Sequence, residues 1–252
     1  MPKSGSDLRT PRLYVDATLA TAAAVPLDHA QMNYLGNVLR LRTGDGVLVF
    51  NGRDGEWQAN LAGDKRRASL AVGERVRAQT GSLDLHYLFA PLKHARLDYM
   101  AQKAVEMGAS RLQPVITERA QVRRLNLDRM RANAIEAAEQ CGILTLPEIG
   151  APQPFEQMVA ERDPGRLLVF CDEEAEVRDP VAALSTARAA SGGQIPLAVL
   201  IGPEGGFAGR ERATLLGLPN MVRLALGPRL LRADTAAVAA LALVGAVLGD
   251  WR

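Results

Sequence analysis

Two glycine-bearing loops in the last third of the chain carry residue types suited to holding a small ligand. The first follows an apolar run and has the sequence Leu200-Ile-Gly-Pro-Glu-Gly-Gly-Phe207. Its glycines remove side chains, so main-chain amides and carbonyls can approach a ligand closely. Ligands of open parallel sheets bind beyond the carboxyl ends of the strands, so this loop is predicted to line a pocket. A tight turn without a ligand would explain the same glycines.

Residue identities in this loop exclude two phosphate-binding motifs. The loop lacks the Gly-Lys-Ser/Thr ending of a Walker A motif and the spacing of GxGxxG. Glu204 would also repel a polyphosphate. A ligand with a neutral or positive reacting centre, such as the sulfonium of S-adenosyl-L-methionine (SAM), suits the loop better.

The second loop follows the next predicted strand and has the sequence Leu226-Gly-Pro-Arg-Leu-Leu-Arg-Ala-Asp-Thr-Ala236. Two such loops are expected to form paired walls of one pocket. Arg232 stands at the start of the following helix, where an RNA phosphate or base could reach it, whereas Arg229 is interpreted as a solvated charge. Asp234 and Thr235 are expected to cap that helix.

Apolar runs alternate with helical periodicity from residue 83 onward, and this alternation predicts a mostly parallel sheet covered on both faces. The last helix, over 234–248, carries Ala, Leu and Val on nearly every side, so it must be covered, either within the core or at a dimer interface. Asn126 is the expected N-cap of a helix over 127–140, and Pro180 is expected to begin another helix. The predicted strands are 85–90, 112–116, 167–171, 197–201 and 222–226.

The N-terminal part has a different pattern. Residues 12–80 contain short strand-like runs separated by turn residues, with one amphipathic helix over 28–41. Its apolar positions are Met32, Leu35, Val38 and Leu39. Glycines in the segment 51–55 predict a β-hairpin. We therefore expect a small β-rich domain over residues 1–80 and an α/β domain over residues 81–252.

Composition restricts the class of protein. A chain of 252 residues with 48% hydrophobic content can bury a large core without disulfides or metals. Cys141 and Cys171 lie far apart, with no second pair at metal spacing, so no metal site is expected. The N-terminus lacks an apolar core of signal-peptide length, and the longest apolar run, 235–248, is too short for a membrane span, so a cytoplasmic protein is expected. Residues 1–80 hold 11 Lys/Arg against 8 Asp/Glu, which is weak support for a polyanionic partner.

At these residues the chain resembles the RsmE-type 16S rRNA uracil-N3 methyltransferases of the SPOUT class. The two loops carry the resemblance together and in this order, and it extends from about residue 12 to the C-terminus. The further matching segments are His29–Arg40, Lys103–Gly108, Pro114–Arg119 and Glu136–Gly142.

The resemblance implies an N-terminal PUA-like β-barrel, a SPOUT-type parallel sheet with a C-terminal trefoil knot, and a homodimer whose interface includes the knotted region. It also implies a SAM site without a metal. One wall would be Leu200, Gly202, Pro203, Glu204, Gly205 and Gly206, and the other Leu224, Leu226, Gly227, Leu230, Leu231, Arg232, Thr235 and Ala236. Alanine in place of Gly205 or Gly206 is expected to weaken SAM binding more than folding.

The implied activity is SAM-dependent methylation of N3 of one uridine of 16S rRNA, position 1498 in the family's usual numbering, with the rRNA or the small ribosomal subunit as partner. Because N3 must lose its proton before it can attack, the protein is expected to supply geometry and proton control. Arg232 is predicted to stabilise the uracil anion or to anchor a phosphate, and Glu204 or Asp234 is the candidate base, with bulk water as a further alternative. The predicted RNA phosphate contacts are Arg12, Arg40, Arg42, Lys93 and Arg119.

Three positions depart from the family pattern. Asp234 replaces a usual glutamate, Ile143 replaces a common arginine whose contacts Arg123 or Arg124 would supply, and Ala120 replaces a frequent serine. Two alternatives remain open: a SPOUT methyltransferase with another rRNA or tRNA target, and a non-catalytic PUA-type RNA-binding assembly protein. A nucleotide-dependent metabolic enzyme is disfavoured, because its phosphate motif is missing.

Overall fold

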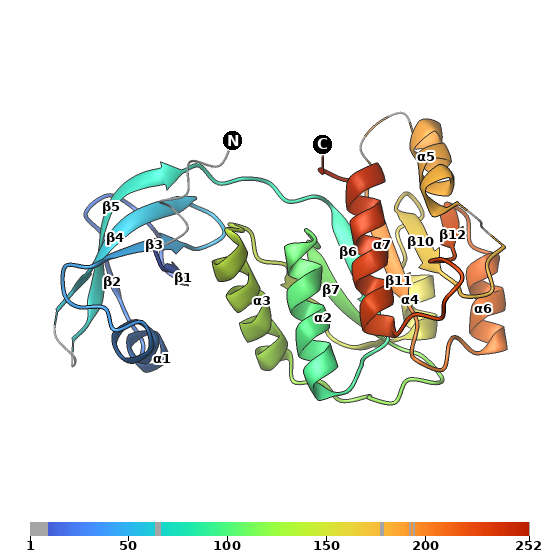
Figure 1. The fold of residues 1–252 in the computed structure, drawn as a ribbon, viewed down its shortest axis with the longest axis horizontal. Helices are drawn as coiled ribbons and strands as arrows, with labels where there is room; N and C mark the ends of the chain where they lie inside the picture. Colours follow the sequence, from blue (N-terminus) through green and yellow to red (C-terminus); the bar gives the residue numbers. More distant parts are fainter. Residues whose placement is uncertain (1–9, 64–66, 177–178, 192, 194, 252) are drawn as a thin grey trace. The chain divides into compact units, whose positions relative to one another are not determined.

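The computed structural model describes residues 10–63, 67–176, 179–191, 193 and 195–251. The chain divides into two compact units. Unit 1 comprises Met1–Gly81 and Ala138–Leu146, and unit 2 comprises Ser82–Ala137 and Pro147–Arg252. Figure 1 colours the strands and the short helix of unit 1 in blue and cyan, and most of unit 2 in green to red.

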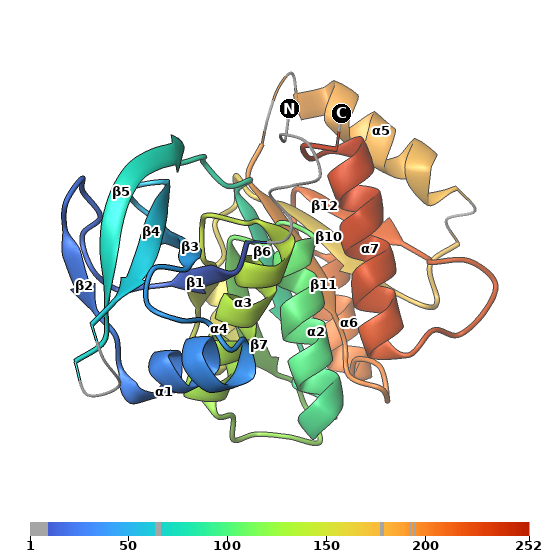
Figure 2. The ribbon, with the colours of Figure 1, turned by 60° about the vertical axis from the view of Figure 1, so that its left-hand side comes forward.

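Unit 1 is a curled half-barrel of five strands with one short helix across an end of the sheet (Figures 1 and 2). The strands occur in the order β1-β3-β4-β5-β2, where β1 and β3 are parallel and the other pairs antiparallel. Gly52 and Gly55, with φ of 81° and 85°, lie in the turn between β3 and β4, so the predicted hairpin is confirmed. The strands are β1 (Arg12–Tyr14), β2 (Ala24–Pro26), β3 (Gly46–Phe50), β4 (Glu56–Ala62) and β5 (Ser69–Arg77).

The helix expected over residues 28–41 changes type along its length. It begins as α1 (His29–Met32) and continues as the π-helix η2 (Asn33–Val38). The Asp28 carboxylate caps its first turn by accepting the backbone N–H of Gln31 at 2.7 Å.

The change of helix type corrects one residue of the predicted apolar face. Leu35 is fully buried in the core of unit 1, and Met32 and Leu39 pack against that core. Val38 is 61% exposed instead. The i→i+5 hydrogen bonding of a π-helix rotates successive residues by less than an α-helix does, so later positions leave the α-helical face.

Unit 2 is built on a parallel sheet in the order β12-β10-β11-β6-β7-β8, with β9 paired to β7. Its strands are β6 (Leu85–Phe89), β7 (Arg111–Ile116), β8 (Glu148–Ile149), β9 (Gln153–Pro154), β10 (Leu167–Cys171), β11 (Leu197–Ile201) and β12 (Met221–Leu224). The helices of the rest of the chain are α2 (His94–Glu106), α3 (Leu127–Cys141), α4 (Phe155–Ala160), α5 (Pro180–Ser191), α6 (Gly209–Leu216) and α7 (Ala233–Val247). The last residues of α3, from Ala138, belong to unit 1.

The alternation predicted from residue 83 onward is confirmed. Each of the five expected strands is present, with end points that differ by two residues or fewer. Asn126 caps α3, since its side-chain oxygen accepts the Arg129 backbone N–H at 2.9 Å, and Pro180 begins α5 as expected.

Helices cover both faces of this sheet (Figures 1 and 2). On one face, Phe155 and Met158 of α4 and Leu215 of α6 pack against sheet residues such as Leu200. On the other face, α7 packs against α2, α5 and β11. Among the described residues, no helix is both long and apolar enough to cross a membrane.

Helix α7 is fully buried along one side only. Its buried side consists of Ala233, Ala237, Ala240, Leu241, Val244 and Gly245. The opposite side, with Val238, Ala239, Ala242 and Leu243, is half-buried. The core therefore accounts for part of its apolar surface, and the described residues of one chain do not provide the expected complete coverage.

Candidate functional site

A cavity of about 780 Å³ lies at the carboxyl ends of β10, β11 and β12 in unit 2. The turns after these strands line it, together with Arg96 of α2 and Arg119, which follows β7. Since β10 lies between β11 and β12, the acidic turn Asp172–Glu174 stands between the two glycine-bearing loops. The volume falls within the usual range for ligand pockets, about 300–1,000 Å³.

Most residues predicted from the two loops line this cavity. They are Gly202, Pro203, Glu204, Gly206, Leu224, Leu226, Gly227, Leu230, Leu231, Arg232 and Ala236. Leu200 is instead fully buried within β11. Gly205 and Thr235 are not among the lining residues in the described part of the chain. Gly205 turns its carbonyl to the Arg119 guanidinium at 2.7 Å, and Thr235 is exposed in the first turn of α7.

The first loop is a tight turn and a cavity wall at the same time. The Gly206 N–H donates to the Pro203 carbonyl at 2.9 Å, and Gly206 has a φ of 69° that favours glycine. A Cβ on Gly202 would lie 2.6 Å from Cε2 of Phe207, closer than van der Waals contact allows. The two explanations of these glycines, turn geometry and an open ligand wall, therefore hold together.

Contacts made by Phe207 and Glu211 hold this loop in place. The Phe207 ring packs edge-on against Phe170, with centroids 5.3 Å apart. The buried Glu211 carboxylate accepts the backbone N–H groups of Ala208 at 2.9 Å and of Glu118 at 2.8 Å. One carboxylate thus joins the turn after β7 to the turn after β11.

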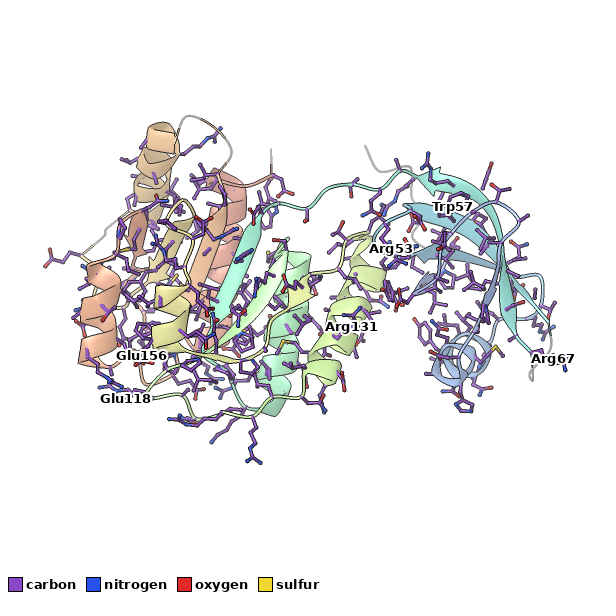
Figure 3. The ribbon with its side chains drawn as sticks, turned by 180° about the vertical axis from the view of Figure 1, so that it is seen from behind. Arg53, Trp57, Arg67, Glu118, Arg131 and Glu156 are labelled. Atoms are coloured by element: carbon purple, nitrogen blue, oxygen red, sulfur yellow. The ribbon has the colours of Figure 1, made fainter. Side chains whose placement is uncertain are left out.

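Exposed arginines form ion pairs with the first loop and with neighbouring segments. Arg96 forms an ion pair with Glu204, and both side chains line the cavity. Arg210 of α6 pairs with Glu118 at 2.9 Å and with Glu156 at 3.8 Å. Glu118 and Glu156 lie at the same edge of unit 2 in Figure 3. These outer pairs are exposed, so each contributes at most about 1 kcal/mol.

Asp172 is the electrostatic centre of the cavity's acidic turn. Its side chain is only 5% exposed and accepts hydrogen bonds from Arg212 Nε at 3.1 Å and Arg223 Nε at 3.0 Å. Burial by itself would raise the pKa of Asp172, but hydrogen bonds from Arg212, the Glu174 backbone N–H and Arg223 outweigh it and lower the pKa. The ionised carboxylate joins α6, β10 and β12. The backbone N–H of Asp172 also donates to the Leu224 carbonyl at 2.9 Å.

Cys171 also lines the cavity, but its chemistry is blocked. Burial raises the pKa of the Cys171 thiol to about 12. A thiol that stays protonated at neutral pH is a poor nucleophile. Within the described residues, no group of His, Cys, Asp and Glu side chains is arranged to hold a metal ion.

The second loop ends at Arg232, which is the N-cap residue of α7. Its φ of −66° and ψ of 153° are extended, and its carbonyl accepts the Ala236 N–H at 2.8 Å. The Arg232 side chain is exposed at the cavity. The expectation that Asp234 and Thr235 cap the helix is wrong, because both lie inside the first turn. The Asp234 carboxylate accepts the Thr235 N–H at 3.0 Å there.

Arg12 is engaged by protein acceptors within unit 1. Its Nε pairs with Glu56 at 2.6 Å, and its guanidinium lies 4.6 Å from the centre of the Phe50 ring. The remaining donors reach main-chain carbonyls of Ala138 at 2.5 Å, Glu139 at 2.9 Å and Ile143 at 3.2 Å. Arg12 therefore ties β1 to the segment Ala138–Leu146.

The other predicted phosphate contacts are exposed. Arg40 and Arg42 follow η2 in unit 1, Lys93 precedes α2, and Arg119 follows β7 in unit 2. Sequence reasoning missed Arg96, Phe207 and the acidic turn after β10 as parts of the cavity. The signal for the last was available, since Asp172 follows an apolar strand whose end lies at the same sheet edge as the two loops.

Comparisons with known families match nearly the whole length. Residues 79–245 match the RNA methyltransferase domain family, and residues 27–72 match the RNA methyltransferase PUA domain family. The parallel-sheet unit with its loop-lined cavity, preceded by a PUA-like half-barrel, thus has the architecture of the RNA methyltransferase class. A ribosomal RNA small subunit methyltransferase E of Rickettsia conorii is 30% identical over 92% of this chain and 94% of its own length. The chain belongs to the ribosomal RNA small subunit methyltransferase E family.

Two solved structures share the fold over nearly all of both chains. A methyltransferase of Legionella pneumophila, in complex with the bound cofactor SAM, has a TM-score of 0.83 at 30% identity and covers 96% of this chain and 99% of its own. A ribosomal RNA small subunit methyltransferase E of Neisseria gonorrhoeae, bound to S-adenosyl methionine, has a TM-score of 0.82 at 26% identity. That comparison covers 97% of this chain and 100% of the other.

Proposed function

We propose that this chain is a SAM-dependent methyltransferase of ribosomal RNA, and that it methylates N3 of one specific uridine in the 16S rRNA of the small ribosomal subunit. The observation that carries the proposal is the cavity at three adjacent strand ends, which both glycine-bearing loops line. Family membership and the solved SAM complexes of two relatives support the same cofactor.

The residues of the cavity fit SAM. Main chain is accessible at Gly202, Gly206 and Gly227, so amide and carbonyl groups can bind a nucleoside and an amino acid. The carboxylates of Glu173, Glu174 and Glu204 line the cavity and complement a cationic sulfonium and ammonium. The volume of about 780 Å³ accommodates a ligand of this size. When bound, SAM supplies an activated methyl group.

The side chains at the cavity control the uracil and its proton. Loss of the N3 proton leaves a negative charge, and we place the exposed Arg232 guanidinium against that anion or the adjoining phosphate. Of the two candidate bases, Glu204 lines the cavity and Asp234 does not. We therefore propose that the Glu204 carboxylate accepts the N3 proton. Its ion pair with Arg96 holds this carboxylate at the cavity.

RNA is held through exposed cations of both units. Arg40 and Arg42 present phosphate contacts on unit 1, and Lys93 and Arg119 present them on unit 2. Arg12 is omitted from this set, because its guanidinium is engaged within unit 1. A cytoplasmic location follows from the proposed substrate.

We also propose that the chain acts as a homodimer through the half-buried apolar side of α7. Leu230, which is 81% exposed just before that helix, extends the same kind of surface. Burying such a surface against a second copy would complete the coverage that the single chain lacks. The trefoil knot that the family resemblance implies belongs to the same C-terminal region. Light scattering at several concentrations measures the association.

The decisive test combines SAM binding with mapping of the product. Calorimetric titration with SAM should give saturable binding, and mass spectrometry of 16S rRNA incubated with protein and SAM should find one added methyl group on a uridine. Arg232→Ala should lower turnover about 10²-fold or more at saturating RNA. Near-normal turnover would remove Arg232 from the mechanism. RNA binding without SAM binding would favour the alternative of a non-catalytic RNA-binding protein.

A further inference from the structure

A second cavity, of about 490 Å³, lies within unit 1 and shares no lining residue with the SAM cavity. One wall is a single helical face, with residues spaced three and four positions apart. This face consists of His29, Met32, Asn33, Gly36 and Asn37. The opposite wall is the end of β4, with Leu61 and Ala62, together with Gly63, which follows β4, and Ala68, which precedes β5. The segment Leu41–Thr43 closes one end.

The chemistry of this groove divides into an apolar floor and a polar rim. Leu61 is buried, and Met32 and Leu41 are half-buried. The rim consists of the exposed side chains of His29, Asn33, Asn37, Arg42 and Thr43. An apolar floor with hydrogen-bonding groups along one edge suits a nucleobase, whose faces are apolar and whose edge carries donors and acceptors.

Two amides on the rim are arranged for a base edge. Asn37 donates to Asn33 through Nδ2 and Oδ1, 2.8 Å apart, across one turn of helix. The pair keeps an amide donor on Asn33 and an amide acceptor on Asn37. A donor beside an acceptor complements the hydrogen-bonding edge of an RNA base.

The backbone around the groove has two uncommon features. The helix wall passes through a π-helical segment, in which the Leu39 N–H donates to the Tyr34 carbonyl at 2.9 Å. Arg40 then takes the left-handed conformation, with a φ of 59°. This conformation is uncommon for a residue with a side chain, and it turns the chain back so that Leu41–Thr43 run beside the helix. Both features are frequent at ligand sites.

We propose that this groove binds one unpaired nucleotide of the RNA substrate, with its base on the Met32 and Leu61 floor, its base edge at Asn33 and Asn37, and its phosphate at Arg42. The inference rests on the proposed RNA methyltransferase function. It adds a second recognition point for the RNA, separate from the base that is methylated. The excess of positive charge in residues 1–80, 11 Lys/Arg against 8 Asp/Glu, favours a phosphate-bearing ligand over a neutral one.

Gly36 offers a direct way to block the groove. Its position lies on the groove wall, and a Cβ there would meet only Met32 Cε, at 4.0 Å. Its φ is not in the left-handed region, so a larger residue introduces no backbone strain. Gly36→Leu should therefore fold and fill the site. Asn37→Ala is the second variant, because it removes a rim contact without adding volume.

The experiment measures binding of fluorescein-labelled single-stranded RNA of about eight nucleotides to the full-length chain, by anisotropy and without SAM. Gly36→Leu, Asn37→Ala and Arg42→Gln should each weaken binding about tenfold, the effect of losing one or two hydrogen bonds or contacts to a charged group. Arg75→Gln, which removes an equal charge from an exposed position on β5, is the matched control and should change binding less than threefold.

Each outcome decides one question. Equal effects of Arg42→Gln and Arg75→Gln, together with full binding by Gly36→Leu and Asn37→Ala, would overturn the inference and leave only general charge attraction. Competition by free nucleoside monophosphates as strong as by the oligonucleotide would identify a free-nucleotide site and overturn the RNA assignment. If the unmodified chain with SAM adds no methyl group to 16S rRNA or to small ribosomal subunits, the proposed function fails. If the groove variants bind the labelled RNA with the same affinity as the unmodified chain, only the inference fails.

Discussion

Substitution of Gly202 by alanine tests whether the first loop is shaped by packing beneath it. The added Cβ would lie 2.6 Å from Cε2 and 3.0 Å from Cδ2 of Phe207, whereas ordinary contact begins at 3.4 Å. The ring would therefore have to move by about 0.8 Å, the difference between 2.6 Å and 3.4 Å. The ring cannot move freely, because the Phe170 ring lies edge-on to it with centroids 5.3 Å apart, and the centroid of the Phe155 ring lies 6.3 Å away.

The expected cost follows from this confinement. Overpacking a filled core typically destabilises by about 1–3 kcal/mol. In a protein of this size each kcal/mol lowers the melting temperature by about 2–4 °C. Phe207 and Gly202 both line the cavity, so a displaced ring also reshapes the ligand wall. We expect SAM affinity to fall about tenfold, which corresponds to about 1.4 kcal/mol.

Gly205→Ala is the matched control in the same loop. A Cβ at Gly205 meets Arg119 Cδ at 3.7 Å and Cβ at 3.9 Å, which are ordinary contacts, and its φ is not left-handed. The structure therefore changes the earlier expectation for Gly205, while that for Gly206, with its φ of 69°, stays a prediction. Differential scanning fluorimetry and SAM calorimetry measure both variants. Equal melting temperatures and equal affinities for Gly202→Ala and Gly205→Ala would refute the steric argument.

Three further substitutions probe the electrostatics around the cavity. Asp172→Asn should destabilise the fold by about 3 kcal/mol in urea titrations, since it leaves Arg212 and Arg223 without their shared anion. Because the pKa of Asp172 is lower in the folded chain, the stability that its ionised carboxylate contributes is complete above the ordinary pKa of 3.8 and is lost as the pH falls below that value. The variant should therefore lose less stability than the unmodified chain on acidification, and an equal dependence of stability on pH would contradict this. Glu211→Gln should cost about 1–3 kcal/mol, because one of the Ala208 and Glu118 N–H groups then faces an amide donor; wild-type stability would show that these N–H groups find other acceptors. Arg210→Ala should change stability by less than about 1 kcal/mol, since its partners Glu118 and Glu156 are exposed, and a larger loss would mean that these pairs are more than surface contacts.

The sheet of unit 2 could be predicted from local pattern because burial leaves a direct trace in the sequence. A strand covered on both faces, such as Leu197–Ile201, must be apolar throughout, and Gly202 directly after it indicates where it ends. Capping by Asn126 is equally local, since the side chain and the N–H that it accepts are three residues apart. For such features the sequence neighbourhood contains both partners of the interaction.

Contacts between distant segments could not be predicted in this way. Asp172 binds Arg212 and Arg223, which lie 40 and 51 positions further along the chain, and nothing in the local pattern selects them. The two glycine-bearing loops line one cavity, as expected, but the sequence did not show that β10 lies between their strands. Sheet order decides which turns meet, and periodicity reports burial without reporting order.

The exposure of Val38 shows a second limit. Its spacing from Leu35 fits an α-helical face, and only the change to π-helical hydrogen bonding moves it outward. Arg12 shows a third limit, since a basic residue near the N-terminus suggests phosphate binding until its acceptors at Ala138 and Glu139 are known. The homodimer and the trefoil knot stay predictions.

Unit 1 includes the segment Ala138–Leu146, so this unit is discontinuous along the chain. A fragment ending at residue 81 would lack the carbonyls that Arg12 binds and the Gly142 carbonyl that Arg77 reaches at 2.7 Å. In such a fragment these donors would bond to water in place of the protein carbonyls, so the unit would lose the contacts that join β1 and β5 to this segment. During synthesis the half-barrel therefore cannot complete its hydrogen bonds until residue 146 has left the ribosome, so the N-terminal unit finishes folding only after more than half of the polypeptide has been made.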